Sequence, residues 1–139
     1  VEKGKELGHG DSAVIKTAFE EGLLKASRLS EEHKELSKKL QQAHPQLNTG
    51  ETDTIALAIQ NKTLTALIDG HAARVAAKLI GVKCTGSIGV LALVFSKGII
   101  SEPEAKSIFN TILKENFRIS SAIALEFYDF IEKLKKRRK

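Results

Sequence analysis

Residues 64–98 read LTALIDGHAARVAAKLIGVKCTGSIGVLALVFSKG, and this stretch decides the fold class. Residues 64–68 have the length and composition of a strand, and residues 72–80 are alanine-rich and typical of a helix. Residues 82–85 indicate a second strand, and residues 87–97 a second helix. Because strands that alternate with helices at this spacing pair in parallel through right-handed crossovers, we predict an α/β fold.

The flanking sequence predicts mostly helices, with capping residues at their starts and glycine or proline near several ends. These helices cover residues 12–21, 31–43, 51–60 and 102–116, with a last helix from Ser121, and a third short strand is predicted at Leu23–Ala26. Three short strands make a narrow sheet for so many helices. The chain also contains no methionine and begins at Val1, so we expect a first strand before Val1.

Length and composition favour one ordinary soluble domain. A chain of 139 residues suits a single domain, residues 1–139, built around one core. Hydrophobic residues at 42% and charged residues at 28% exclude disorder by charge excess, and the single cysteine, Cys84, excludes an internal disulfide. The longest mostly apolar run, Ile88–Phe95, is too short for a membrane helix, and no secretory signal opens the chain. We therefore expect a cytoplasmic protein without membrane contact.

The positive charge is concentrated at the C-terminus. The net charge is +5, but without the six basic residues of 133–139 the chain has 16 basic against 17 acidic residues. Such a run is either a solvated helix end or a source of salt-sensitive affinity for phosphates, and we expect its removal to leave the fold intact. The basic residues of this tail are Lys133, Lys135, Lys136, Arg137, Arg138 and Lys139.

Acidic residues follow the first predicted strand and open the helix that leads into it. Ligands of a parallel sheet bind beyond the carboxyl ends of its strands, and Asp69 comes directly after residues 64–68. A carboxylate there can ligate a hard divalent cation, with Glu51 and Asp53 as further ligands on the same edge. The alternative is structural, because acids near a helix N-terminus also stabilise the helix dipole.

Polar residues beside this edge suit a phosphate. Thr85-Gly86-Ser87 lies between a strand and its helix, where free N–H groups and a hydroxyl could bind an anion, although such turns also simply allow close packing. His71 is either a surface residue or a contact to substrate or metal. Arg74 pairs either with Asp69 or with a phosphate. A nucleotide-binding domain is disfavoured, because no phosphate-cradling glycine motif is present.

Four segments in this order resemble the PIN-domain family, most closely its prokaryotic branch of predicted nucleic-acid-binding proteins, which is related to toxin-type ribonucleases of toxin–antitoxin pairs. The resemblance spans nearly the whole chain, from about Lys3 to about Phe130. The segments are GETDTIALA at residues 50–58, LIDGHAARVA at 67–76, TGSIGVL at 85–91 and KGII at 97–100.

The resemblance implies a three-layer α/β/α domain with a short central parallel sheet. It also implies a cleft whose acids bind Mg²⁺ or Mn²⁺ for phosphodiester hydrolysis of RNA. Glu51, with Asp53, matches the acid that opens the central helix, and Asp69 matches the acid after the following strand. Thr85 and Ser87 flank the glycine beside the cleft. The implied partners are RNA, an antitoxin-like protein and a second copy of the chain. Either a missing segment or a second copy is expected to cover the large apolar residues that a three-strand sheet does not, namely Ile99, Ile100, Phe109, Ile112, Phe117 and Phe127.

Two departures from the family pattern keep an alternative open. The family's first strand carries an aspartate of the metal site, and the given chain does not supply it. Where relatives show two successive acids, this chain has Asp69-Gly70. The leading hypothesis is therefore a metal-dependent endoribonuclease. The alternative is a domain of the same fold that binds nucleic acid or a partner without catalysis, with a degenerate metal site.

Overall fold

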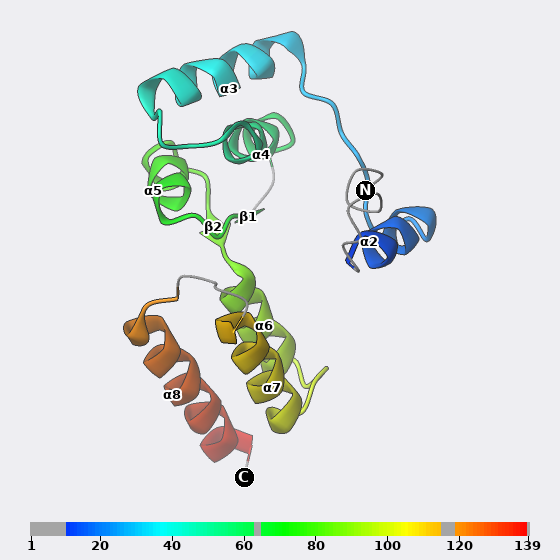
Figure 1. The fold of residues 1–139 in the computed structure, drawn as a ribbon, viewed down its shortest axis with the longest axis vertical. Helices are drawn as coiled ribbons and strands as arrows, with labels where there is room; N and C mark the ends of the chain where they lie inside the picture. The colour runs from blue at the N-terminus through cyan, green and yellow to red at the C-terminus, as the bar shows by residue number, and fades with distance from the viewer. Residues whose placement is uncertain (1–10, 63–64, 115–118, 139) are drawn as a thin grey trace.

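The computed structural model describes residues 11–62, 65–114 and 119–138. Predictions that involve Leu64, residues 115–118 and Lys139 lie outside these residues. Figure 1 shows the elements, which are α2 (Asp11–Glu20), α3 (Glu31–Ala43), α4 (Thr49–Gln60), β1 (Ala66–Leu67), α5 (His71–Leu79), β2 (Cys84–Thr85), α6 (Ser87–Ser96), α7 (Glu102–Lys114) and α8 (Ser121–Arg138).

The predicted α/β class, with a short parallel sheet, is confirmed. β1 and β2 pair in parallel, with Ala66 opposite Cys84 and Leu67 opposite Thr85. The N–H of Ile68 donates to the carbonyl of Thr85 at 2.8 Å, so the pairing continues one residue beyond β1. α5 connects the two strands, as the alternation of strand and helix predicted. Both strands are shorter than the sequence pattern indicated.

The strand predicted at Leu23–Ala26 is wrong. The chain bends after α2, and residues 25–30 have no regular structure. Leu23 and Leu24 are exposed. A strand requires a neighbour with which to exchange hydrogen bonds, and the sheet of the described residues contains only β1 and β2.

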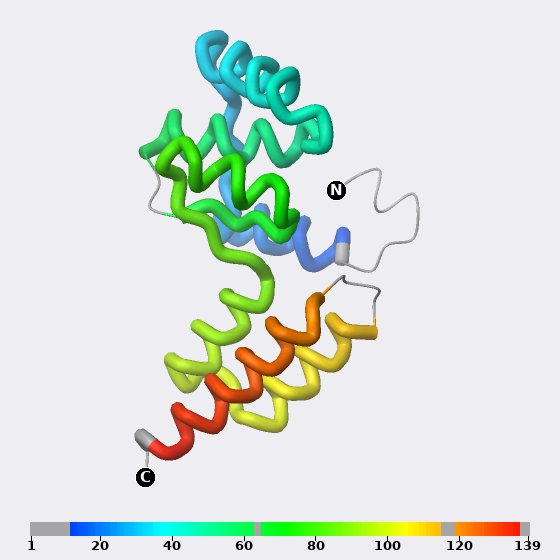
Figure 2. Tube along the Cα trace, turned by 90° about the vertical axis from the view of Figure 1, so that its left-hand side faces the viewer, coloured from blue at the N-terminus to red at the C-terminus, as the bar shows by residue number. Residues whose placement is uncertain are grey.

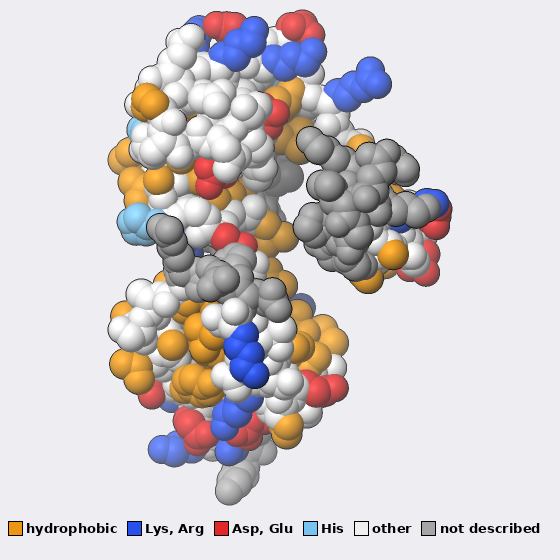
Figure 3. Space-filling model, in the orientation of Figure 1, with side chains coloured by type: hydrophobic (Ala, Val, Ile, Leu, Met, Phe, Trp, Pro, Cys, Tyr) orange, Lys and Arg blue, Asp and Glu red, His pale blue; other side chains and the backbone are white. Residues whose placement is uncertain are grey.

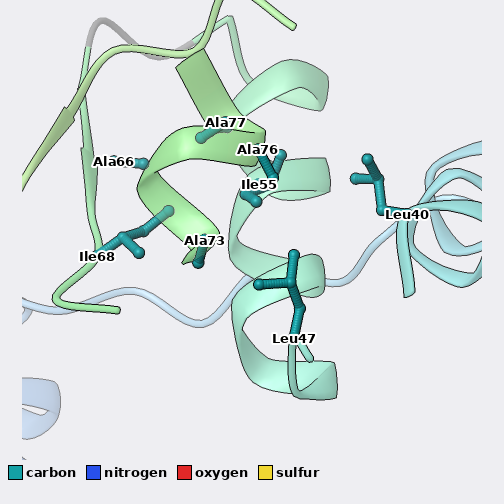
Figure 4. Packing of buried hydrophobic residues seen from close by; sticks show 9 residues of the cluster. Leu40, Leu47, Ile55, Ala66, Ile68, Ala73, Ala76 and Ala77 are labelled. Carbon is teal, nitrogen blue, oxygen red and sulfur yellow. The ribbon is translucent and has the colours of Figure 1, made fainter. Parts of the chain in front are cut away.

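One hydrophobic cluster, here called the sheet cluster, holds α4 and α5 against the sheet and α3 against α4. Ala66 and Ile68 point toward α5, whose Ala73 and Ala77 are fully buried (Figure 4). These small side chains allow the helix to approach the strands closely. Leu67 faces the opposite side of the sheet and is 64% exposed.

A second cluster, here called the helical cluster, lies among α6, α7 and α8. Phe109 and Phe127 stack with ring centroids 4.3 Å apart, and Tyr128 meets Phe109 edge-on. Phe127 and Ile131 are buried, which confirms the apolar stripe predicted for the last helix. The single core expected from the chain length is wrong, because α6 begins just after β2 and leads away from the sheet (Figures 1 and 2).

The C-terminal basic run is the end of α8. Leu134 packs against the helical cluster, and Lys135 Nζ lies 3.0 Å from Glu102 Oε2 on α7. Leu134 and Lys135 thus hold α8 against the helical cluster and α7. The expectation that residues 133–139 can be removed without effect on the fold is therefore corrected, because their removal takes away both contacts. No helix of the described residues, α8 included, is long and apolar enough to cross a membrane.

Candidate active site

Asp69 is fixed at the carboxyl end of β1 by the start of α6. Its Oδ1 accepts a hydrogen bond from the Ser87 N–H at 2.7 Å, and its Oδ2 accepts one from the Ser87 hydroxyl at 2.7 Å. Gly86, the N-cap residue of α6, provides no side-chain cap, so Asp69 caps this helix from another element. Each carboxylate oxygen has two lone pairs, and the hydrogen bonds from Ser87, which are those seen among the described residues, use one on each.

Glu51 reaches the same edge from the first turn of α4. Its Oε2 accepts a hydrogen bond from the Asn48 N–H at 3.0 Å, and its own N–H donates to Asn48 Oδ1 at 2.9 Å, which forms a capping box. The other carboxylate oxygen, Oε1, lies against Gly70, where a Cβ would collide with it. Gly70 therefore lets the Glu51 carboxylate approach the residue that follows Asp69.

Asp53 does not join these two carboxylates. Its Oδ1 accepts a hydrogen bond of 2.6 Å from the hydroxyl of Ser37, which is buried on α3. Ser37 Oγ also lies 2.9 Å from Thr52 Oγ1, so Asp53 belongs to the polar contact between α3 and α4. The expected convergence of all three acids fails at Asp53 because residues two apart on a helix do not share a face.

The Thr85-Gly86-Ser87 turn owes its glycine to close packing. A Cβ on Gly86 would lie 2.7 Å from Asp69 Oδ1 and would disturb the Asp69–Ser87 contact. Thr85 is half-buried at the end of β2, with its hydroxyl against Gly89 of α6. The Ser87 hydroxyl donates to Asp69, and so its first role is to orient that carboxylate.

Arg74 is half-buried on α5 close to this turn, and its guanidinium is 3.6 Å from the position of a Cβ on Gly86. Among the described residues no ion pair involves Arg74, so the expected pairing with Asp69 does not form. Burial raises the pKa of the Cys84 thiol, with a smaller opposing effect from Arg74. Cys84 therefore stays protonated near neutral pH. His71, the first residue of α5, is exposed.

A pocket of about 470 Å³ lies between this edge and α8. Asp69, Arg74 and Thr85 provide its polar side, and side chains of α6 and α8 provide an apolar side that includes Ile123 and Phe130. Glu126 of α8 also lines the pocket, and sequence reasoning missed it. No sequence spacing relates Glu126 to Asp69, because the packing of α8 brings them to one cavity. Within the described ranges no three His, Cys, Asp or Glu side chains form a group that could hold a metal ion.

Comparison with known proteins gives the family. A family model described as a PIN domain matches residues 1–133, so the chain belongs to the PIN-domain family. The short parallel sheet with its helices is consistent with the α/β/α architecture of that family. The PIN domain is a nuclease-type fold associated with nucleic-acid binding, and PIN domains generally use divalent metal ions. No curated protein and no solved structure matches the chain.

Proposed function

We propose that this chain is a metal-dependent endoribonuclease whose site lies at the carboxyl end of β1, with Asp69 and Glu51 as the metal ligands. The observation that carries the proposal is the approach of Glu51 Oε1 to Gly70, the residue next to Asp69. Two carboxylates from separate elements thereby flank one edge of the sheet. Family membership supports the reaction class.

The donor set fits Mg²⁺ or Mn²⁺. Mg²⁺ is usually held by one or two carboxylates together with waters and substrate phosphates, so Asp69 and Glu51 suffice as protein ligands. A cation bound there supplies a water of lowered pKa and neutralises charge on the phosphate. The residues around it have distinct tasks. Ser87 orients the Asp69 carboxylate, and Arg74, which forms no ion pair among the described residues, offers its guanidinium to a phosphate oxygen. Thr85, which lines the pocket, and His71, which is exposed at the start of α5, are the further substrate contacts of the proposal.

The proposal is tested by incubating single-stranded RNA with the wild type and three variants, with and without Mn²⁺. Asp69→Asn and Glu51→Gln keep the side-chain size and remove the charge, and we expect both to abolish metal-dependent cleavage. Asp53→Asn is the matched control, because Asp53 contacts Ser37 on the far side of α4, and it should keep most activity. Equal RNA loss in the wild type and Asp69→Asn, or equal damage from Asp53→Asn, overturns the proposal.

A second candidate, a binding domain without catalysis, is favoured by the two hydrogen bonds that Ser87 donates to Asp69. In that case Asp69 is a helix cap and Gly70 marks a degenerate metal site. Calorimetric titration with Mn²⁺ separates the two functions. Heat that vanishes in Asp69→Asn supports the nuclease, whereas RNA binding without any Mn²⁺ heat supports the binding domain.

The partners implied by the resemblance stay predictions, namely an antitoxin-like protein and a homodimer, as does the cytoplasmic location. Phe109 and Phe127, expected to pack against either a missing segment or a second copy, are buried in the helical cluster instead. Ile99, in the turn between α6 and α7, and Leu125 of α8 are each 68% exposed, and hydrophobic side chains gather over this group of helices in Figure 3. We therefore place the dimer contact on these residues, and sedimentation at micromolar concentration tests it. A clean monomer mass contradicts it.

A further inference from the structure

A second cavity, of about 650 Å³, lies between α5 and β2 and carries basic side chains. Here it is called the basic groove, and its charged lining residues are Arg74 and Lys78 of α5 and Lys83, which precedes β2. Arg74 and Lys78 are four residues apart and therefore share one face of the helix. None of the described residues that line the groove is acidic.

The three cations have no counterion in the described part of the chain, since no ion pair there involves Arg74, Lys78 or Lys83. Like charges four residues apart on a helix destabilise it, and a third cation, just before β2, adds to the repulsion. An anionic ligand in the groove relieves this repulsion. The arrangement thus suits a ligand with several negative charges in a row.

The basic groove is continuous with the candidate active site. Arg74, Cys84 and Thr85 line both the groove and the pocket that holds Asp69. A chain that lies across Asp69 can therefore continue past Arg74 toward Lys78 and Lys83. On its other side the pocket presents Phe130 and Ile123, and a basic track beside an aromatic surface is typical of sites for single-stranded nucleic acid.

We propose that the basic groove binds successive backbone phosphates of a single-stranded RNA whose next segment lies at Asp69. This inference rests on the proposed function for the identity of the polymer. Arg74 contacts the phosphate nearest the site, and Lys78 and Lys83 contact phosphates farther along the chain. The contacts position the RNA and carry no base specificity.

The test measures binding of a fluorescent 12-nucleotide single-stranded RNA in EDTA, so that no cleavage occurs, by anisotropy over a series of salt concentrations. The test variant of the full chain is Lys78→Gln with Lys83→Gln. The control is Lys39→Gln with Lys97→Gln, which removes two exposed lysines that line neither cavity. Both variants lose the same charge and keep the C-terminal basic residues.

We expect the groove variant to lower the slope of log affinity against log salt by about 0.7 for each lost phosphate contact, and the control to leave it unchanged. At ~0.1 M salt this slope corresponds to about fivefold weaker binding per contact. Equal behaviour of groove and control variants, or no RNA binding by the wild type, overturns the inference. Competition by polyglutamate as strong as that by RNA at equal charge also overturns it, because the groove is then a site for acidic protein.

The readout also separates this inference from the proposed function. If the groove variant loses RNA binding while the wild type cleaves no RNA with Mn²⁺, the inference about the basic groove is supported and the proposed ribonuclease function is wrong. If the wild type cleaves RNA while the groove and control variants bind RNA equally well, the proposed ribonuclease function is supported and the inference about the basic groove is wrong.

Discussion

The carboxylate of Asp69 accepts a hydrogen bond on each of its oxygens from Ser87, and so it joins the end of β1 to the first turn of α6. β1 belongs to the sheet cluster, and α6 belongs to the helical cluster. Asp69 and Ser87 are 18 positions apart in the sequence, and their contact links the two clusters. The same carboxylate is one of the two metal ligands that we propose, so its orientation would serve both stability and the proposed chemistry.

Ser87→Ala removes the hydroxyl donor and leaves the N–H bond to Asp69. We expect the free energy of unfolding to fall by about 1 kcal/mol, the usual net contribution of one hydrogen bond. Urea denaturation measures it. Ser107→Ala, an exposed serine of α7, is the control and should leave stability within about 0.5 kcal/mol. If the two variants have the same stability, the hydrogen bond from the Ser87 hydroxyl to Asp69 contributes nothing to folding.

Gly70→Ala tests whether Gly70 makes room for Glu51. The added Cβ collides with Glu51 Oε1, and the flexible carboxylate escapes only by leaving its capping box with Asn48. We expect a loss of about 1 kcal/mol in the free energy of unfolding, comparable to a lost cap. In the Glu51→Ala background the same substitution should cost nothing, because the obstacle is gone. A double-mutant cycle measures this coupling, and equal costs in both backgrounds contradict it.

The contact of Glu102 with α8 makes stability depend on pH. Hydrogen bonds from Lys106 and then Lys135 hold the pKa of Glu102 below its ordinary value of 4.5. The carboxylate therefore stabilises the fold above pH 4.5, and this contribution is lost as pH falls through the lowered pKa. The same contact raises the pKa of Lys135 above 10.5, so its contribution disappears in strong alkali.

Thermal unfolding of the wild type and Glu102→Gln between pH 7 and 3 checks this dependence. The wild type should be the more stable protein at pH 7, and its advantage should vanish toward pH 3. Glu35→Gln, which changes an exposed acid of α3, is the control and should show no comparable trend. A constant difference between wild type and Glu102→Gln over the whole range refutes the role of the ion pair.

Features with local signals were predicted well. The helix starts were expected to carry capping residues. The Ser30 hydroxyl accepts a hydrogen bond from the His33 N–H as the N-cap of α3, and Ser101 and Glu104 form a capping box at the start of α7. Gly81 ends α5 with a φ of +83°, a conformation that favours glycine. Each of these depends on residues within one helical turn. The strand at Leu23–Ala26 failed because a strand depends on a distant partner that composition does not reveal.

The site was predictable in part. Asp69 could be placed because it follows a strand, and Glu51 because it opens the helix before that strand. The sequence could also have shown that Asp53 lies apart from Glu51, since residues two positions apart on a helix point to different faces. The pairing of Asp69 with Ser87 and the position of Glu126 depend on how α6 and α8 pack. The sequence contains no short-range signal for either.

A truncation that leaves the packing of α8 intact tests its last basic residues separately from Leu134 and Lys135. Removal of residues 136–139 takes away four cations and spares Leu134 and Lys135, so the free energy of unfolding should not change. If these cations contact phosphates, the slope of log RNA affinity against log salt should fall by about 0.7 for each contact, at most about 2.8 in all.

Removal of residues 133–139 should also destabilise the helical cluster, because the Leu134 packing and the Lys135–Glu102 ion pair are lost. Urea denaturation and RNA anisotropy on the two truncated chains measure both effects, and an unchanged salt slope excludes a role of these cations in RNA binding.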